Sequence, residues 1–277
     1  MAKISAVLVC LNIEKEIDRC LGSVAWCDEI VVVDSFSTDR TVEQARRHTD
    51  RIFQHEYPGY SRQVERALGY ATGEWVFLID GDEECSPELA AQCRKIADGP
   101  PPGPGDPVGY TVLRRVNAFG RWIDHSGFYP EYKFRFFRRD HAQPVHREVH
   151  GAIAADGPVG RLDGRLFHYS WTTVYSYLQR LNNYTSLEVA NRLRERPDAR
   201  ASWSRIVFSP VGHFLRRYLR KGGWRDGFPG LAIAVLEAVS VAAIYLKLRE
   251  FRMREAEGAG ELPPITNEEI NAAKRNF

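Results

Sequence analysis

Carboxylates follow two apolar segments in the N-terminal half, at the point where each segment ends. Asp80 and Asp82 come directly after the run WVFLI at 75–79, and Asp34 comes directly after IVVV at 30–33. Carboxylate oxygens are the ligands that Mg²⁺ and Mn²⁺ prefer, and magnesium is often held by one or two carboxylates together with phosphate oxygens. The Asp-x-Asp triplet therefore indicates a site for a divalent cation and a diphosphate, although such triplets also occur in surface turns.

Asp34 has two interpretations. In the first, its carboxylate accepts hydrogen bonds from the pyrimidine ring or the ribose of a bound nucleotide. In the second, Asp34 and Asp39 accept hydrogen bonds from the free N–H groups of the helix that follows, which is a frequent role of aspartate before a helix. The capping interpretation is preferred for Asp39, and both interpretations remain open for Asp34.

Strand and helix signals alternate through the first hundred residues. Apolar, β-branched runs predict strands over 4–10, 29–34, 51–54 and 75–79. Apolar residues at helical spacing predict helices over 14–24, 41–48, 61–71 and 87–97. This alternation is typical of parallel βαβ units, in which ligands bind beyond the carboxyl ends of the strands. Asp34 and the cluster 80–83 are expected at that ligand-binding edge of a Rossmann-like region.

A second region follows the segment GPPPGPGDP at 99–107, whose prolines and glycines predict a linker or a surface loop. Strands are expected over 109–116 and 133–138, on either side of an aromatic loop at 122–132. From residue 172 onward the spacing of apolar residues is helical. The chain is therefore expected to have an α/β fold with a helical C-terminal extension.

Composition and local pattern argue against several classes of protein. The net charge of +2 combines an acidic segment at 28–88 with scattered basic clusters, whereas nucleic acid needs a continuous basic face. The five cysteines contain no Cys-x-x-Cys pair, so neither a disulfide framework nor a zinc site is expected. Residues 11–15 (LNIEK) contain no glycine, which argues against the phosphate-binding loop of a nucleotidyltransferase or an NAD-dependent oxidoreductase.

The two ends of the chain differ in what they predict about membranes. The apolar run 4–11 is short and lacks a basic lead, so it does not resemble a signal peptide, and a cytoplasmic location is expected. Near the other end, the segment 231–246 is apolar except for Glu237 and Ser240. A membrane span needs about twenty apolar residues, which leaves an interfacial membrane helix, a buried helix and an oligomer contact as interpretations. The basic and aromatic residues at 214–224 favour the membrane surface.

Longer segments resemble glycosyltransferase family 2, and the closer likeness is to its branch of lipopolysaccharide-core heptose β-1,4-glucosyltransferases. The resemblance begins with VVVDSFSTDRTVEQA and QVERALGYATGEWVFLIDGDEE in the first hundred residues. It continues through GRWIDHSGFYPEYKFRFFRR, DGPVGRL, HYSW and YLRKGGWRDGFPGLAIA. Because the resemblance extends over nearly the whole chain, it is far more specific than the Asp-x-Asp triplet alone.

The resemblance implies a GT-A type nucleotide-sugar-binding domain over 1–170, with a nucleotide-binding half at 1–98 and an acceptor half at 108–170. It implies a helical, membrane-associated extension over 171–277. The implied reaction is an inverting transfer from a nucleoside diphosphate sugar, with UDP-glucose as the expected donor. The implied acceptor is a cell-envelope glycan or a lipid-linked saccharide such as lipopolysaccharide core. The enzyme is then expected to act at the inner face of the cytoplasmic membrane.

The same resemblance implies roles for individual residues. Asp34 is expected to contact the base of the donor, Asp80 the ribose side, and Asp82 the divalent metal, Mg²⁺ or Mn²⁺. Arg135 lies in a run of alternating arginines and phenylalanines, and guanidinium groups pair well with phosphate oxygens. Arg135 is therefore the expected diphosphate-binding residue, with solvated surface arginines as the simpler interpretation of its neighbours.

An inverting reaction also needs a general base beside the acceptor hydroxyl. Relatives carry a Val-His-Glu before a stretch like DGPVGRL, whereas this chain has Val-His-Gly at 149–151. Glu148 is the preferred candidate for the base, with Glu131 and Asp124 as alternatives, and a surface carboxylate paired with an arginine is the competing interpretation. The missing glutamate leaves an alternative function open, in which the chain is a catalytically silent relative that binds a nucleotide or a membrane and acts as a scaffold.

Overall fold

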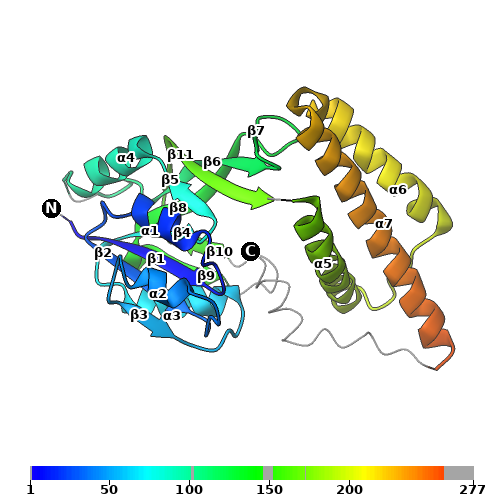
Figure 1. Ribbon diagram of the computed structural model, residues 1–277, viewed down its shortest axis with the longest axis horizontal. Helices are drawn as coiled ribbons and strands as arrows, with labels where there is room; N and C mark the ends of the chain where they lie inside the picture. The colour runs from blue at the N-terminus through cyan, green and yellow to red at the C-terminus, as the bar shows by residue number, and fades with distance from the viewer. Residues whose placement is uncertain (1, 101–102, 146–151, 172, 259–277) are drawn as a thin grey trace. The chain divides into compact units, whose positions relative to one another are not determined.

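In the computed structural model, the described residues are 2–100, 103–145, 152–171 and 173–258, and they form two units (Figure 1). The first unit contains the described residues of Met1–Arg115 and Pro130–Tyr169. The second contains Val116–Tyr129 and the described residues from Ser170 onward. Two strands, β6 (Gly109–Ala118) and β11 (Val159–Trp171), run from the first unit into the second.

The first unit is built on a mixed sheet with the strand order β3-β2-β1-β4-β8-β6-β11-β5. Its parallel part comprises β1 (Ile4–Cys10), β2 (Glu29–Asp34), β3 (Ile52–Gln54) and β4 (Trp75–Asp80). β8 (Glu131–Arg138) pairs antiparallel with β4 and with β6, and β5 (Glu83–Cys85) pairs antiparallel with β11. A separate antiparallel pair consists of β9 (Ala142–Val145) and β10 (Ala152–Ala155).

Alternate residues of the central strands bury side chains on opposite faces of the sheet. Leu8, Val32 and Phe77 belong to one apolar cluster, which also contains residues of α1 (Ile17–Ser23) and α4 (Pro87–Ala97). The other cluster contains residues of α3 (Tyr60–Tyr70), and its strand members include Val7, Val31 and Val76. Burial on both faces explains why these strands are almost continuously apolar in the sequence.

The predicted strands and helices of the first hundred residues are present, with shifts at some ends. α1 begins at Ile17 rather than at residue 14, and in the segment before it the backbone N–H groups of Ile13 and Glu14 donate to the side chains of Thr41 and Asp39. α2 (Thr41–Ala45) is shorter than predicted. α4 begins as predicted, since the Ser86 hydroxyl accepts a hydrogen bond from Leu89 N.

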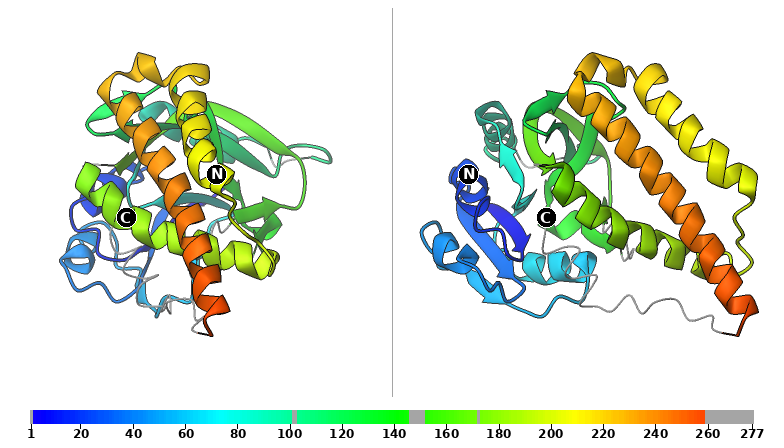
Figure 2. Two further views of the ribbon diagram at one scale, coloured as in Figure 1. Left: turned by 90° about the vertical axis from the view of Figure 1, so that its right-hand side faces the viewer. Right: turned by 45° about the vertical axis from the view of Figure 1, so that its right-hand side comes forward.

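The second unit is mainly helical (Figures 1 and 2). It contains β7 (Arg121–Ile123), which pairs with the end of β6, and the helices α5 (Val174–Glu195), α6 (Trp203–Leu215) and α7 (Phe228–Ala256). α6 and α7 lie side by side, and α5 packs against α7. Between α6 and α7 the chain forms a π-helical turn, Arg216–Arg220, and a 3-10 turn, Gly223–Asp226.

α7 is longer than the apolar segment 231–246 suggested. Among the described residues it is the one helix long and apolar enough to cross a membrane by length and composition, with a mean hydropathy of 2.0 in its most apolar window. Only 22% of that window is buried inside the structure. Most of that window is therefore not fully buried, unlike the core helix of a soluble domain.

Candidate functional site

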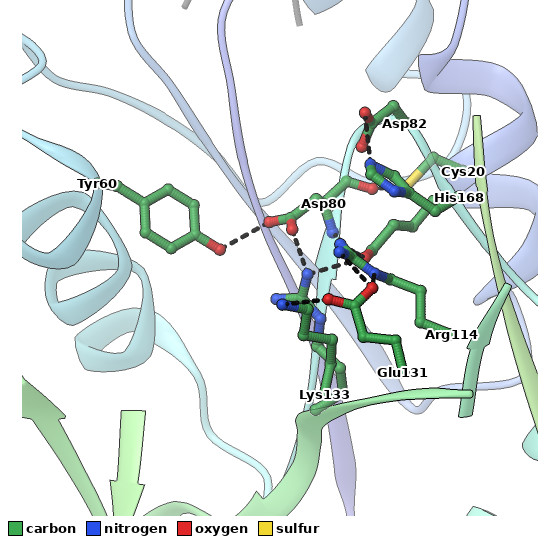
Figure 3. A network of polar contacts seen from close by, with 10 residues as sticks. Cys20, Tyr60, Asp80, Asp82, Arg114, Glu131, Lys133 and His168 are labelled. Atoms are coloured by element: carbon green, nitrogen blue, oxygen red, sulfur yellow. Dashed lines mark hydrogen bonds and ion pairs between the residues drawn. The ribbon is translucent and has the colours of Figure 1, made fainter. Parts of the chain in front are cut away.

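The acidic cluster lies at the carboxyl end of β4, where the chain turns into β5 (Figure 3). β4 ends at Asp80, the turn contains Gly81 and Asp82, and β5 begins at Glu83. A side chain at position 81 would lie 2.3 Å from Ile13 Cδ1, so glycine permits the turn to pack against the segment that follows β1. The triplet therefore lies beyond the carboxyl end of a central parallel strand, which is where such sheets bind ligands.

Asp80 is held by two neighbouring side chains. The hydroxyl of Tyr60, from α3, donates to Asp80 Oδ1 at 2.7 Å, and the guanidinium of Arg135, from β8, donates to Asp80 Oδ2. Burial opposes ionisation of Asp80, but the charge of Arg135 and these two hydrogen bonds outweigh it and lower its pKa. The Asp80 side chain remains 29% exposed, so the carboxylate is fixed in place, ionised and partly accessible.

Glu83 lies beneath Asp80 and is fully buried. Its Oε2 accepts from the backbone N–H of Asp80 at 3.1 Å, and its Oε1 lies 2.9 Å from Arg135 Nη2 and 3.4 Å from Arg114 Nη1. Burial alone would lower the pKa of Arg135, but Asp80 and Glu83 raise it well above its ordinary value. Arg135 is therefore permanently charged and directed at two carboxylates, which locks the shape of the acidic turn.

Asp82 pairs with a histidine that is distant in the sequence. His168, on β11, points toward Asp82 (Figure 3), with its Nε2 3.0 Å from Asp82 Oδ2. The backbone N–H of Tyr169 donates to the carbonyl of Asp82 at 2.9 Å. The residue pair His168 and Glu83 is in register between β11 and β5, which explains how β11 carries the imidazole to the turn. The side chains of His168 and Asp82 are nearly buried, at 12% and 9% exposure.

A divalent cation fits this pair if phosphate supplies its other ligands. In the described part of the chain no three His, Cys, Asp or Glu side chains are arranged to hold a metal ion. Mg²⁺ and Mn²⁺, however, typically take one or two carboxylates and complete their coordination with phosphate oxygens and water. Asp82 and His168 offer one carboxylate oxygen and one imidazole nitrogen at the ligand-binding edge of the sheet, so the residues present fit such an ion.

Asp34 ends the neighbouring strand β2 and is fully buried. Its Oδ2 accepts from Ser37 N and Gln54 Nε2, each at 2.9 Å, and its Oδ1 accepts from the Ser37 hydroxyl and the Cys10 thiol. These four donors occupy the lone-pair directions of the carboxylate. Asp34 therefore shapes the turn at 35–38, and a direct contact with the nucleotide base remains a prediction.

The candidates for the general base lie in different surroundings. Glu131 is paired with Lys133 and, through Nη2 at 2.7 Å, with Arg114; burial raises its pKa, but these cations outweigh burial and lower it. Asp124 belongs to the second unit, where its backbone N–H donates to the carboxylate of Asp226 at 3.2 Å. Glu148 lies outside the described residues, and its assignment stays a prediction.

His168 and Tyr60 are the two site residues that sequence reasoning missed. The histidines of this chain lack the spacing of metal ligands in the sequence. His168 is 86 positions from Asp82, so only the pairing of β11 with β5 brings the two together. The motif HYSW, which forms part of the family resemblance, was the signal that could have drawn attention to His168.

Comparisons with known proteins agree with the sequence motifs. The family model described as Glycosyl transferase family 2 matches residues 5–153. The lipopolysaccharide core biosynthesis glycosyltransferase LpsC of Rhizobium meliloti (strain 1021) is 30% identical, over 85% of this chain and 88% of LpsC. An uncharacterised glycosyltransferase of Rickettsia typhi is 25% identical, over 92% of this chain and 89% of that protein. The crystal structure of S. aureus TarS 1–349 has a TM-score of 0.42 and 18% identity, covering 92% of each chain.

The parallel strands and their acidic edge define an α/β protein of the nucleotide-binding, Rossmann-like class. The chain belongs to glycosyl transferase family 2. Its fold is the GT-A type with a helical C-terminal extension, so the predicted fold class is confirmed. The match with LpsC agrees with the branch of the family that the sequence motifs resemble.

Proposed function

We propose that this chain is a metal-dependent, inverting glycosyltransferase that uses UDP-glucose and modifies a lipid-linked or cell-envelope saccharide of the lipopolysaccharide-core type. The observation that carries the proposal is the pairing of Asp82 with His168 at 3.0 Å, beside an Asp80 fixed by Tyr60 and Arg135. Family membership supports the reaction class, and the similarity to LpsC supports the acceptor class. The choice of donor rests on the motif resemblance.

The acidic turn is preorganised for a charged donor. Asp82 and His168 would hold Mg²⁺ or Mn²⁺, which supplies positive charge to the leaving diphosphate. Asp80 keeps a partly exposed carboxylate for the ribose side of the donor. Because Arg135 is buried against Asp80 and Glu83, we assign it the positioning of these carboxylates rather than direct contact with the diphosphate. A turn that is fixed before the donor binds loses little reorganisation energy during the reaction.

In the proposed reaction, the acceptor hydroxyl attacks the anomeric carbon while the bond from that carbon to the diphosphate oxygen breaks. A carboxylate takes the proton of the attacking hydroxyl. Glu148 is our candidate for this base. Glu131 is a weaker candidate, because its ion pairs with Arg114 and Lys133 lower its pKa and with it its affinity for a proton.

We also propose that the second unit contacts the inner surface of the cytoplasmic membrane. On α7, one helical face carries large apolar side chains that are 40% or more exposed: Phe228, Leu231, Val235, Val239, Leu246 and Met253. The turn between α6 and α7 is strongly basic, at Arg216–Lys221. An exposed apolar face next to basic residues is the composition of segments that lie in the headgroup region of anionic membranes.

Thermal stabilisation by nucleotide sugars tests the donor site. A ligand that binds the folded state raises Tm by mass action. We expect UDP-glucose with Mn²⁺ to raise the Tm of the parent protein and to leave that of Asp82→Asn unchanged. Asp18→Asn is the matched control, because Asp18 also pairs with a histidine, His48, at 3.0 Å but on the surface.

Transfer to a saccharide acceptor, or hydrolysis of the donor, then tests catalysis in the same three proteins. Activity in the parent and in Asp18→Asn, but not in Asp82→Asn, supports the proposal. Donor binding without transfer or hydrolysis for any acceptor supports the catalytically silent scaffold instead. Equal stabilisation of Asp82→Asn and the parent refutes the assignment of Asp82.

A further inference from the structure

The second unit contains a cavity that the glycosyltransferase site does not use. It lies among α5, α6 and α7 and has a volume of about 470 Å³. This volume is in the range of small-molecule sites, about 300–1,000 Å³. Its polar lining comes from Arg192 on α5, from Ser209 and His213 on α6, from Arg216 just beyond α6, and from Tyr245 on α7.

The α6 side of the cavity is one helical face. Three lining residues, Gly212, His213 and Arg216, lie three, four and seven positions after Ser209, so all four lie on the same side. A Cβ added at Gly212 would meet no atom within 4 Å. Glycine in a helix interior costs about 1 kcal/mol relative to alanine, and here the missing side chain keeps the wall of the cavity open.

The arginines of the cavity differ in how they are held. Arg192 Nε donates to Glu188 at 2.7 Å, and its guanidinium lies 5.5 Å from the ring centre of Tyr245, so the group is oriented before any ligand binds. Arg216 is exposed, and no ion pair of its guanidinium is formed with the described residues. His213 is paired with Glu237 at 3.0 Å. Arg216 is therefore the cation whose charge is available to a ligand.

The wall of the cavity adjoins an apolar surface. On α6 the lining residues alternate in sequence with Phe208, Val211 and Leu215, whose side chains are 71%, 54% and 45% exposed. A polar ligand in the cavity would have this apolar strip beside it. A molecule that carries both an anionic head and long acyl chains matches the two surfaces together, whereas a free phosphate matches only the first.

We propose that this cavity binds the phosphate headgroup of an anionic membrane phospholipid. Arg216 and Arg192 pair with the phosphate oxygens, the hydroxyls of Ser209 and Tyr245 donate to them, and the acyl chains lie along Phe208, Val211 and Leu215. Guanidinium groups recognise phosphate with charge-assisted hydrogen bonds. This inference deepens the membrane contact proposed above and rests on it, but it does not depend on the donor site.

Vesicle sedimentation with the full-length protein tests the cavity. Binding is measured to phosphatidylcholine vesicles and to vesicles that also contain phosphatidylglycerol, and the ratio of the two affinities is the readout. For Arg216→Gln we expect this ratio to fall about 50-fold, through the lost phosphate pair and the lost charge. Arg220→Gln is the matched control, because it removes the same charge from the same turn outside the cavity, and a loss of about fivefold is expected.

Gly212→Leu distinguishes lipid binding in the cavity from nonspecific electrostatic attraction to the vesicle surface. It places an apolar side chain in the wall of the cavity beside Ser209 and Arg216 without changing the charge. We therefore expect at least a tenfold loss in the ratio, whereas simple attraction between a basic turn and an anionic surface predicts no loss. The added leucine increases insertion into both kinds of vesicle, which the ratio cancels. A ratio for Gly212→Leu equal to that of the parent, together with equal losses in Arg216→Gln and Arg220→Gln, would overturn the proposal.

Further measurements distinguish lipid binding in the cavity from binding of free phosphate, from the membrane contact and from the donor site. If inorganic phosphate raises the Tm of the parent but not of Arg216→Gln, and phosphatidylglycerol gives no preference, the ligand is a free phosphate and the lipid assignment is wrong. If the parent binds no vesicles at all, the membrane contact itself is refuted. Stabilisation by UDP-glucose is expected to be the same in the parent and in all three variants, so a failure of the donor site is recognised independently.

Discussion

In the first unit charged side chains are buried, whereas in the second unit large apolar side chains are exposed. Arg135 and Glu83 are 7% and 0% exposed, at the centre of a network that includes Asp80. Trp203 and Phe208 of α6 are 65% and 71% exposed. Both placements cost free energy. A buried charge loses its hydration, and exposed apolar surface has an unfavourable free energy of contact with water. The buried charges of the first unit are compensated by one another, whereas the exposed apolar side chains of the second unit point to a partner that the isolated chain does not provide.

The difference indicates which kind of partner each unit meets. A buried network of ion pairs is geometrically rigid, which suits a site that must present carboxylates to a charged small molecule. An exposed apolar face that is continuous along a helix suits an extended apolar surface, for which exact geometry matters less. The first unit is thus suited to recognition of a small ligand, and the exposed face of the second unit agrees with the membrane contact that we propose.

Among the variants that test this difference between the units, Arg135→Ala is expected to lower the free energy of unfolding the most. Removal of the guanidinium leaves Asp80 and Glu83 without their shared cation, and breaking a buried ion pair on one side typically costs about 3–5 kcal/mol. Chemical denaturation measures the change. Arg138→Ala is the control on the same strand, because its pair with Asp140 is on the surface and is expected to contribute at most about 1 kcal/mol. Equal losses of unfolding free energy in the two variants would show that the buried ion pairs contribute no more to stability than the surface pair.

His168→Ala tests whether the acidic turn needs its imidazole. We expect the transfer rate at limiting Mn²⁺ to fall by about 10–100-fold, as for changes around metal ligands, with partial recovery at high Mn²⁺. His48→Ala is the control, since His48 forms the same kind of pair with Asp18 at the same distance on the surface. An unchanged dependence on Mn²⁺ would assign His168 a purely structural role.

The sequence allowed most of the first unit to be predicted, for a physical reason. β1 and β2 have the predicted ends, because strands buried on both faces must be apolar throughout and stop where polar residues begin. The ends of α1 and α2 were less predictable. Before α1, the backbone N–H groups of Ile13 and Glu14 donate to Thr41 and Asp39, which are more than twenty positions away, and local sequence does not encode such contacts.

The site was only partly predictable, since its residues come from distant strands. Asp80 and Asp82 follow an apolar run and are visible in the sequence. The pairing of His168 with Asp82, and of Arg135 with Asp80, depends on how β11 and β8 join the sheet, which no local pattern encodes. In the second unit, the segment 231–246 predicted an apolar helix but not its length, because α7 continues into the charged residues 247–256.

The stability of the first unit is expected to depend on pH through Glu29. Burial opposes its charge, but hydrogen bonds from Ser5 and Thr72 outweigh burial and lower the pKa of Glu29 to about 2. A carboxyl group with a lowered pKa stabilises the fold above its unfolded value of 4.5, and this contribution is lost as the pH falls toward 2. Denaturation between pH 6 and pH 3 is expected to show a loss on the order of 1–2 kcal/mol. In Glu29→Gln that part of the pH dependence should be absent; an identical profile would contradict the assignment.

Phe208→Ser is expected to have the smallest effect on stability. Because the ring is 71% exposed, its loss should change the free energy of unfolding by no more than about 0.5 kcal/mol. Phe136→Ala, at a fully buried phenylalanine of β8, should cost about 3–5 kcal/mol. Binding to phosphatidylcholine vesicles should reverse this order, with about a tenfold loss for Phe208→Ser, since a ring that inserts contributes about 1.5–3 kcal/mol. If Phe208→Ser lowers stability as much as Phe136→Ala and leaves vesicle binding unchanged, the exposed face of α6 belongs to the protein's own packing, and the contrast between the two units is lost.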